Sequence, residues 1–185
     1  MLGEVVETGE EKFTLNDLLE VAKKMEEVGN RYKTHLFSLF AQMFCTLAEE
    51  VISRFGDEGR DAVAEAVKRF GEERGRRIAE LVKSLGKPLD LKNFFIYSDF
   101  DSRGNLTYSV NIVDGDVEIT VTECPFAKGC RDWGKEEYGS IYCEHIDKAV
   151  LRGYNPSLVL EVPENMTKGD KRCLLRYLAP GKQPG

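Results

Sequence analysis

Apolar side chains in the first half of the chain recur every three or four residues, which is the period of an amphipathic helix. The pattern predicts helices at about 14–28, 31–55 and 57–85. The middle helix carries one continuous apolar face, formed by Leu36, Phe40, Met43, Leu47 and Val51. A face this wide is typical of a helix that is largely buried or lies at a contact between subunits.

From residue 91 onward the apolar positions alternate, which is the period of a β-strand. One strand is predicted at 93–100, and two more flank Asp114-Gly115, a dipeptide typical of a two-residue hairpin turn. This turn sets Val113 opposite Asp116 and Thr107 opposite Thr122. Six apolar side chains then share one face of the hairpin: Tyr108, Val110, Ile112, Val117, Ile119 and Val121.

The remaining pattern predicts a loop at 125–139, a helix at 140–152, and strands at 158–162 and 172–178. Helices followed mainly by strands indicate an α+β fold, with the N-terminal helices packed on a C-terminal antiparallel sheet and one further helix. We expect a single domain over 1–185. Its helical part covers 1–88, and its sheet part covers 91–180 and includes the helix at 140–152.

Composition narrows the class of protein. The 185 residues are 42% hydrophobic and 31% charged, with a net charge of −6, which argues against a nucleic-acid partner. No apolar run approaches the ~20 residues of a membrane span, and the N-terminus lacks a signal-peptide core. We therefore expect a cytoplasmic protein that binds a small molecule, with no membrane partner. The wide apolar face of the second helix leaves a homodimer open.

Five cysteines are the unusual feature of the composition: Cys45, Cys124, Cys130, Cys143 and Cys173. An odd count without a secretion signal argues against a disulfide framework. Four of the five lie between 124 and 173, so the C-terminal half is expected to hold the chemistry. Their spacing lacks the C-x2-C pair of a zinc ribbon. Cys45 lies within an apolar helix and is expected to be an inert core residue.

Helix geometry separates the polar residues of the helix at 140–152. Cys143 and Asp147 are four residues apart and share a face, whereas His145 lies about 200° around the axis from Cys143. His145 is therefore not expected to act as a base for Cys143, and an exposed histidine is the simpler interpretation. Asp147 could hold a cationic substrate group or orient a water, or it could only balance nearby surface cations. Asp170 could simply close a turn before Cys173.

Several short segments of the C-terminal half resemble the L-2-amino-thiazoline-4-carboxylic acid hydrolase family. They are Glu123-Cys124-Pro125, Tyr142-Cys143-Glu144 with Asp147, Gly153-Tyr154-Asn155-Pro156, and Gly169-Asp170 followed by Cys173. The helical region with Gly71 and Gly75 is similar in layout. The resemblance implies a hydrolase without a cofactor that opens a cyclic, amidine-like C=N bond. It also implies a set of catalytic residues: Cys124, Cys143, Asp147, Asp170 and Cys173.

In this first hypothesis a thiolate or an activated water attacks the electrophilic carbon, while Asp147 or Asp170 holds the amidinium group. An arginine, Arg74 or Arg176, would bind the ring carboxylate. A thiolate at neutral pH needs a nearby cation to lower the thiol pKa. Three cations lie close enough in sequence to be candidates: Lys128, Arg131 and Arg176.

The layout also resembles, more distantly, the 4-vinyl reductase domain, which implies a second hypothesis. The protein would then be a non-catalytic ligand- or redox-sensing module that binds zinc or an iron–sulfur cluster. The metal ligands would be Cys124, Cys130, Cys143 and Cys173. A third hypothesis is a relative that keeps the fold alone. The first two both predict that Cys124, Cys143 and Cys173 lie together, with Cys45 elsewhere among apolar side chains.

Overall fold

The computed structural model describes residues 15–16, 34–100, 106–113 and 115–178. The chain divides into two units, Met1–Thr34 and His35–Gly185. In the first unit, residues 15–16 are helical, and the rest of the helix predicted at 14–28 lies outside the described residues.

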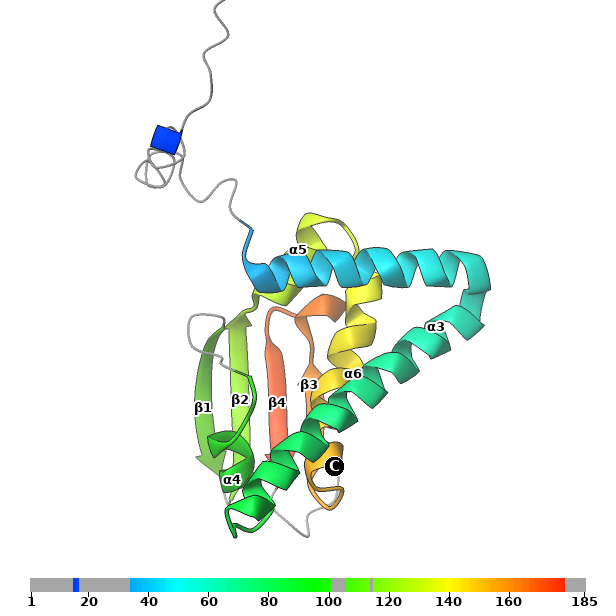
Figure 1. Cartoon of the computed structure of the whole chain (residues 1–185). Helices are drawn as coiled ribbons and strands as arrows, with labels where there is room; N and C mark the ends of the chain where they lie inside the picture. Colours follow the sequence, from blue (N-terminus) through cyan, green and yellow to red (C-terminus); the bar gives the residue numbers. More distant parts are fainter. Residues whose placement is uncertain (1–14, 17–33, 101–105, 114, 179–185) are drawn as a thin grey trace, which may run out of the picture. The chain divides into compact units, whose positions relative to one another are not determined.

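The second unit begins with α3 (Leu36–Ser84), a long helix with a sharp kink (Figure 1). The kink falls at Gly56, whose φ of 61° and ψ of −135° are readily adopted only by glycine. The two helices predicted at 31–55 and 57–85 are thus the two arms of α3. His35 precedes the first arm, and its Nδ1 accepts a hydrogen bond from the Phe37 N–H at 3.1 Å. It is an exposed helix cap and not a core residue.

The first arm of α3 buries mostly small side chains and exposes several of its large apolar ones. Its buried residues are Ser38, Ala41, Gln42, Cys45 and Ala48. Leu36, Met43 and Leu47 are between 58% and 79% exposed. Small side chains on this face allow a close approach to α5, where a Cβ on Gly129 would lie 2.8 Å from the Cα of Ser38. Within this chain, Leu36, Met43 and Leu47 of the predicted apolar face are therefore open, and their contact with a second copy stays a prediction.

By length and composition alone, α3 contains one segment that is apolar enough to cross a membrane. The protein buries 28% of that segment. Core helices of globular proteins meet the same criterion, so the finding is weak evidence for a span.

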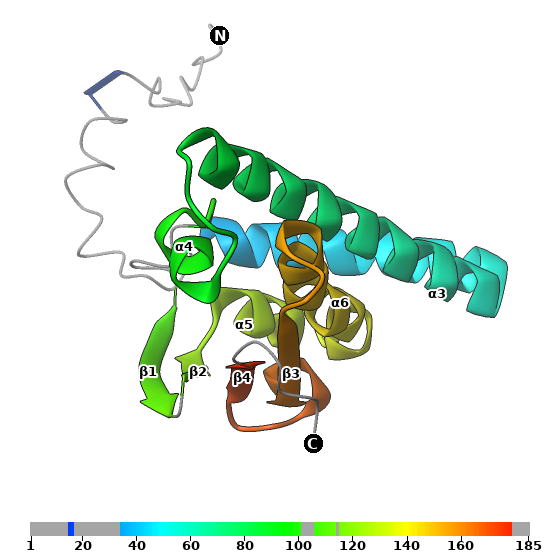
Figure 2. The ribbon, with the colours of Figure 1, turned by 90° about the horizontal axis from the view of Figure 1, so that it is seen from below.

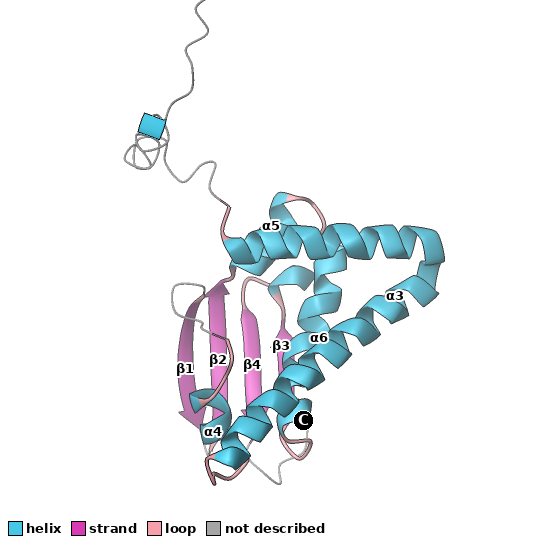
Figure 3. Cartoon of the chain, viewed as in Figure 1, coloured by secondary structure: helices cyan, strands magenta, loops and turns pink. Residues whose placement is uncertain are grey.

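The sheet has four antiparallel strands in the order β1-β2-β4-β3 (Figure 3). They are β1 (Thr107–Val113), β2 (Asp116–Glu123), β3 (Val159–Glu164) and β4 (Cys173–Leu178). The hairpin of β1 and β2 has the predicted register from Val113–Asp116 to Tyr108–Val121. A bulge then moves Thr107 opposite Glu123, so its predicted pairing with Thr122 is wrong.

Two segments differ in type from the prediction. The helix α4 (Leu91–Ile96) replaces the strand expected at 93–100, and the Asp90 side chain caps it by accepting a hydrogen bond from the Asn93 N–H at 2.8 Å. The helix α5 (Pro125–Asp132) forms within the expected loop, with proline at its first position. The helix α6 (Glu136–Tyr154) includes the predicted 140–152 and extends beyond both ends.

The helices lie on one face of the sheet, with α6 between α3 and the strands (Figure 2). Glycines bring α6 and the second arm of α3 into close contact. A Cβ on Gly75 would lie 2.1 Å from the Val150 carbonyl oxygen, and one on Gly153 would lie 2.2 Å from that of Glu72. The paired glycines of α3 therefore serve packing. The observed architecture is α+β, as predicted.

Candidate functional site

Six residues with titratable side chains form the group that we call the Asp147 cluster: Cys124, Tyr142, Cys143, Asp147, Cys173 and Tyr177. The charge of Asp147 acts on each of the other five. The charges of Cys124 and Cys173 also act on Cys143. That Cys124, Cys143 and Cys173 share one pocket stays a prediction.

The periods of helix and strand place these side chains. Cys143 and Asp147 lie one helical turn apart on α6. Cys173 and Tyr177 lie at the start and near the end of β4, on the same face of the sheet because strand side chains alternate. The Cys173 Sγ accepts a hydrogen bond from the Met166 N–H at 3.3 Å. Cys124 follows β2 directly and is the N-cap residue of α5.

Asp147 is exposed to solvent, yet protein surrounds it closely enough that burial raises the pKa of its carboxyl group. Exposure and a raised pKa are compatible for this residue. Water can reach the carboxyl group from one side, while the protein atoms on its other sides remove part of its hydration. The positive charge of Arg74 lowers the same pKa, but burial has the larger effect. A reachable carboxyl group with a raised pKa is suited to taking up and releasing a proton.

The three thiols of the cluster are held in the neutral form. Burial raises the pKa of Cys143 well above its ordinary value, raises that of Cys124, and raises that of Cys173 to about 11. Asp147 acts on all three in the same direction. These pKa directions are opposite to the lowered thiol pKa that a nucleophilic cysteine in this cluster would need.

Two of the three cations proposed to stabilise a thiolate are paired elsewhere. The Arg176 side chain donates a hydrogen bond to Glu118 at 2.8 Å across the β2–β4 pair. Both residues lie on the sheet face opposite Tyr177. Lys128 forms an ion pair with Asp132 along the exposed side of α5. Arg176 is consequently also unsuited to binding a substrate carboxylate beside Asp147.

Arg74 is the cation that acts on Asp147, and it is itself paired. Its guanidinium group donates two hydrogen bonds to Asp99, at 2.9 and 2.6 Å, and lies 5.6 Å from the centroid of the Phe70 ring. The Arg74 side chain is only 20% exposed. Sequence analysis named Arg74 but missed Asp99, because Asp99 follows α4 in a segment predicted as a strand.

Aromatic side chains adjoin the cluster. The Tyr142 ring stacks on Phe126 with centroids 4.7 Å apart, and Phe40 and Phe44 each meet its edge at 5.4 Å. Burial raises the pKa of Tyr142 and of Tyr177, so both phenols keep their protons. Sequence analysis assigned neither tyrosine to the site. The one available signal was the position of Tyr142 next to Cys143 in the family-like segment.

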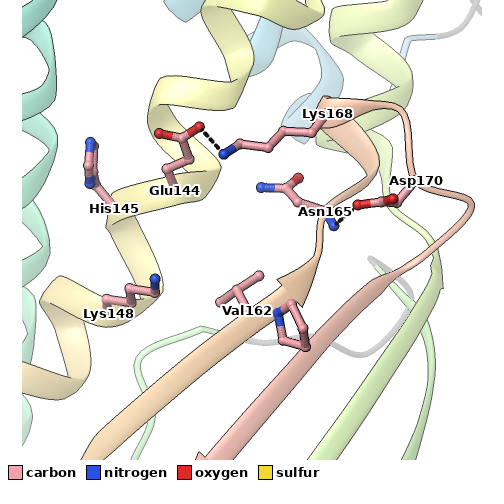
Figure 4. A pocket seen from close by; sticks show the side chains of 8 residues that line it. Glu144, His145, Lys148, Val162, Asn165, Lys168 and Asp170 are labelled. Carbon is pink, nitrogen blue, oxygen red and sulfur yellow. Dashed lines mark hydrogen bonds and ion pairs between the residues drawn. The ribbon is translucent and has the colours of Figure 1, made fainter. Parts of the chain in front are cut away.

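Asp170 is engaged in a turn, and it lines a separate pocket of about 320 Å³ (Figure 4). Its carboxylate accepts a hydrogen bond from the Asn165 N–H at 2.7 Å, closing the connection from β3 to β4. His145 and Glu144 line the same pocket, and Glu144 forms an ion pair with Lys168. His145 lies at this pocket, on α6 about 200° around the helix axis from Cys143. The charge of Asp170 still reaches Cys173.

Cys130 pairs with Cys45. Their Sγ atoms lie 3.5 Å apart, and both residues are 0% exposed. Cys45 is buried, as expected, but sequence analysis did not predict that it contacts the thiol of Cys130. Within the ranges that the structure describes, no three or more His, Cys, Asp or Glu side chains are placed to hold a metal ion. The geometry gives no support to zinc or iron–sulfur binding by Cys124, Cys130, Cys143 and Cys173.

The segment Gly153-Tyr154-Asn155 has a structural role. The Tyr154 hydroxyl donates a hydrogen bond to the Asp90 carbonyl oxygen at 3.0 Å, and the Asn155 side chain donates one to that of Leu89 at 2.7 Å. Gly153 allows the close contact with α3. These residues fix the end of α6 against the turn before α4.

The sequence profile for L-2-amino-thiazoline-4-carboxylic acid hydrolase matches residues 37–177. The chain belongs to the L-2-amino-thiazoline-4-carboxylic acid hydrolase family. The match runs from the first turn of α3 nearly to the end of β4 and includes the whole Asp147 cluster. Family membership supports a hydrolase-like function in general. It does not confirm the more distant resemblance to the 4-vinyl reductase domain.

Other comparisons add little to the family assignment. A search of curated proteins finds no significant match. Among solved structures, the chain is similar to the crystal structure of a trafficking protein particle complex subunit 3 from Naegleria fowleri covalently bound to palmitic acid. The two are 16% identical, the match covers 80% of this chain and 98% of the other, and the TM-score is 0.48.

Proposed function

We propose that this member of the family is a hydrolase in which Asp147 activates the water that opens a cyclic, amidine-type substrate. The observation that carries the proposal is the exposed carboxyl group of Asp147, whose pKa burial raises, among neutral thiols and phenols. Family membership supports hydrolysis, and the geometry supports this carboxyl group as the group that handles the proton.

The reaction needs one base that later acts as an acid. The Asp147 carboxylate takes a proton from water while the water oxygen bonds to the amidinium carbon. The C=N π electrons move to the ring nitrogen, which neutralises the substrate cation. The adduct then collapses: its hydroxyl oxygen forms a C=O bond with this carbon, the ring bond to the leaving heteroatom breaks, and Asp147 returns its proton to that heteroatom. The hydroxyl proton, which balances the charge of the substrate cation, passes to solvent. One water is consumed, and the enzyme is restored.

The other cluster residues fit this mechanism better than a covalent one. A thiol nucleophile must ionise, and burial opposes ionisation of Cys143 and Cys173. The neutral thiols would instead line the substrate site. Tyr142 and Tyr177 remain able to donate hydrogen bonds to a substrate carboxylate, since burial keeps them protonated. The Arg74 charge favours the carboxylate form of Asp147 that the first step requires.

The test compares Asp147→Asn with Asp132→Asn on L-2-amino-thiazoline-4-carboxylate, with the addition of water to the substrate followed by mass spectrometry. Because asparagine cannot accept the proton, kcat/KM should fall roughly 100-fold or more for Asp147→Asn. Asp132 lies on the exposed side of α5 and carries the same substitution as a control, so its variant should turn over like the wild type.

The pH profile supplies a second readout. A base works only when deprotonated, so kcat/KM should fall as the pH drops through the pKa of Asp147. This acid limb should lie above the ~3.9 of an ordinary aspartate, because burial raises the pKa. Undiminished turnover by Asp147→Asn would refute the proposal. So would a wild-type protein that leaves this substrate unchanged.

A further inference from the structure

Two buried thiols meet where α3, α5 and α6 come together. Cys45 lies on α3 and Cys130 on α5, and their Sγ atoms are 3.5 Å apart. Gly139 of α6 leaves room for the pair, since a Cβ there would lie 2.3 Å from the Cys130 Sγ and 3.4 Å from the Cys45 Sγ. Neither residue belongs to the Asp147 cluster, and the proposed hydrolysis uses neither.

We propose that Cys45 and Cys130 form an oxidative modification site, at which hydrogen peroxide converts the two thiols into an intrachain disulfide that ties α3 to α5. A disulfide bond is about 2.05 Å long, so the sulfur atoms must close a gap of about 1.5 Å. Among the described residues, this is the one contact in which a thiol donates a hydrogen bond to another thiol. The two sulfur atoms are therefore already in contact.

The two thiols have different roles in the reaction. The side-chain hydrogen bond between Cys45 and Cys130 is the largest cause that lowers the pKa of Cys45, and the charge of Lys135 acts in the same direction. The pKa of Cys130 is raised, chiefly by the same hydrogen bond. Cys45 is thus the sulfur that ionises and attacks first, and Cys130 is the sulfur that resolves the intermediate.

The steps balance. The Cys45 sulfur attacks one peroxide oxygen, the O–O bond breaks, and a sulfenic acid and one water result. The Cys130 sulfur then attacks the Cys45 sulfur, the S–O bond breaks, and a second water leaves with the proton of the Cys130 thiol. Each sulfur loses one electron, and the two peroxide oxygens gain two. Overall, two thiols and one peroxide give one disulfide and two waters.

The site also has a consequence for the fold. Both sulfur atoms are closed to solvent, so peroxide must enter when α5, a helix of eight residues, moves from α3. Because α5 starts directly after Cys124, the disulfide would also restrict the movement of Cys124, a member of the Asp147 cluster. The amide protons of α5 should then exchange more slowly in the oxidised protein than in the reduced one.

The decisive experiment uses the full chain with Cys124, Cys143 and Cys173 replaced by serine. After hydrogen peroxide and denaturation, a thiol assay should count no free thiols where the reduced protein has two, and dithiothreitol should restore both. Peptide mapping without reductant should find the segments containing Cys45 and Cys130 joined within one chain. Adding Cys45→Ala to this background should abolish the link.

Wild-type protein treated in the same way provides the measurement that needs no substitution. The same pair of peptides should be joined, and the free-thiol count should fall by two for each link formed. The proposal is overturned if the Cys45 and Cys130 peptides never appear joined in the wild type. It is equally overturned if the joined peptides come from two chains.

Discussion

At the scale of single residues, desolvation governs the acid–base behaviour of the Asp147 cluster. Removing a group from water disfavours its charged form, so burial raises the pKa of Asp147 and of the three nearby thiols. For Asp147, the effect leaves a carboxyl group able to exchange protons with water. For the cysteines, it leaves side chains that are small and neutral. Burial therefore gives the two kinds of residue different roles. It leaves Asp147 able to handle the proton, and it leaves the cysteines to line the site.

Alkylation should reveal these neutral thiols. The pKa of Cys173 is about 11, against ~8.5 for a free thiol, which makes its thiolate roughly 300-fold scarcer at pH 7. Iodoacetamide should modify Cys173 of the folded protein correspondingly more slowly than a free cysteine derivative, and Cys143 should react slowly as well. Peptide-resolved mass spectrometry over a pH series measures both rates. A midpoint at or below pH 8.5 for Cys173 would contradict this expectation.

At the scale of elements, the contact between α3 and α6 depends on glycine. These two helices approach so closely that the backbone of one lies where a Cβ of the other would be. Glycine within a helix costs about 1 kcal/mol relative to alanine, so its presence at these positions is offset by the packing that it permits. The close contact also places Arg74 of α3 near Asp147 of α6, which joins the packing to the chemistry.

Replacing Gly75 by alanine should therefore destabilise the protein. The new Cβ would lie 2.1 Å from the Val150 carbonyl oxygen and 2.6 Å from the Tyr154 nitrogen, both of which are backbone atoms. The resulting shift of the helices should cost roughly 2 kcal/mol, more than the gain in helix propensity. Urea denaturation measures the change. Arg77→Ala, at an exposed position of the same helix, should stay within about 0.5 kcal/mol of wild type. A Gly75→Ala protein as stable as wild type would show that the helices separate without cost.

At the scale of the whole second unit, the kink in α3 allows one helix to contact two regions of the fold. The first arm packs on α5 through small side chains, and the second arm packs on α6 through glycines (Figure 1). A straight helix could not follow both contacts. The backbone conformation of Gly56 therefore affects the packing of α5 and α6 on the two arms of α3.

The variant Gly56→Ala should lower stability through backbone strain alone. No atom lies within 4 Å of the position that its Cβ would take, so the cost comes from the positive φ of 61°. We expect a loss of roughly 1–2 kcal/mol. Thermal unfolding followed by circular dichroism measures it, with Glu58→Ala as an exposed control in the same turn. An unchanged melting temperature would mean that the kink does not require glycine.

Local patterns of the sequence determined several features without the structure. The Asp114-Gly115 turn and the alternation around it set the register of the β1–β2 hairpin, which is confirmed except at Thr107. Helical period alone placed Cys143 and Asp147 on one face of α6, and His145 lies at a separate pocket. These predictions succeed because each depends on residues a few positions apart, which the backbone geometry of one element relates directly.

Tertiary structure decided the rest. The segment at 93–100 folds as α4 because Asp90 caps it and Phe94 enters the core, which overrides its strand-like alternation. The pairing of Arg74 with Asp99 and that of Cys45 with Cys130 join segments 25 and 85 residues apart. The raised pKa values of the Asp147 cluster arise from crowding by α3, α6 and the sheet together. Local period carries no information on such contacts, because the distance between two elements is set only when their side chains pack.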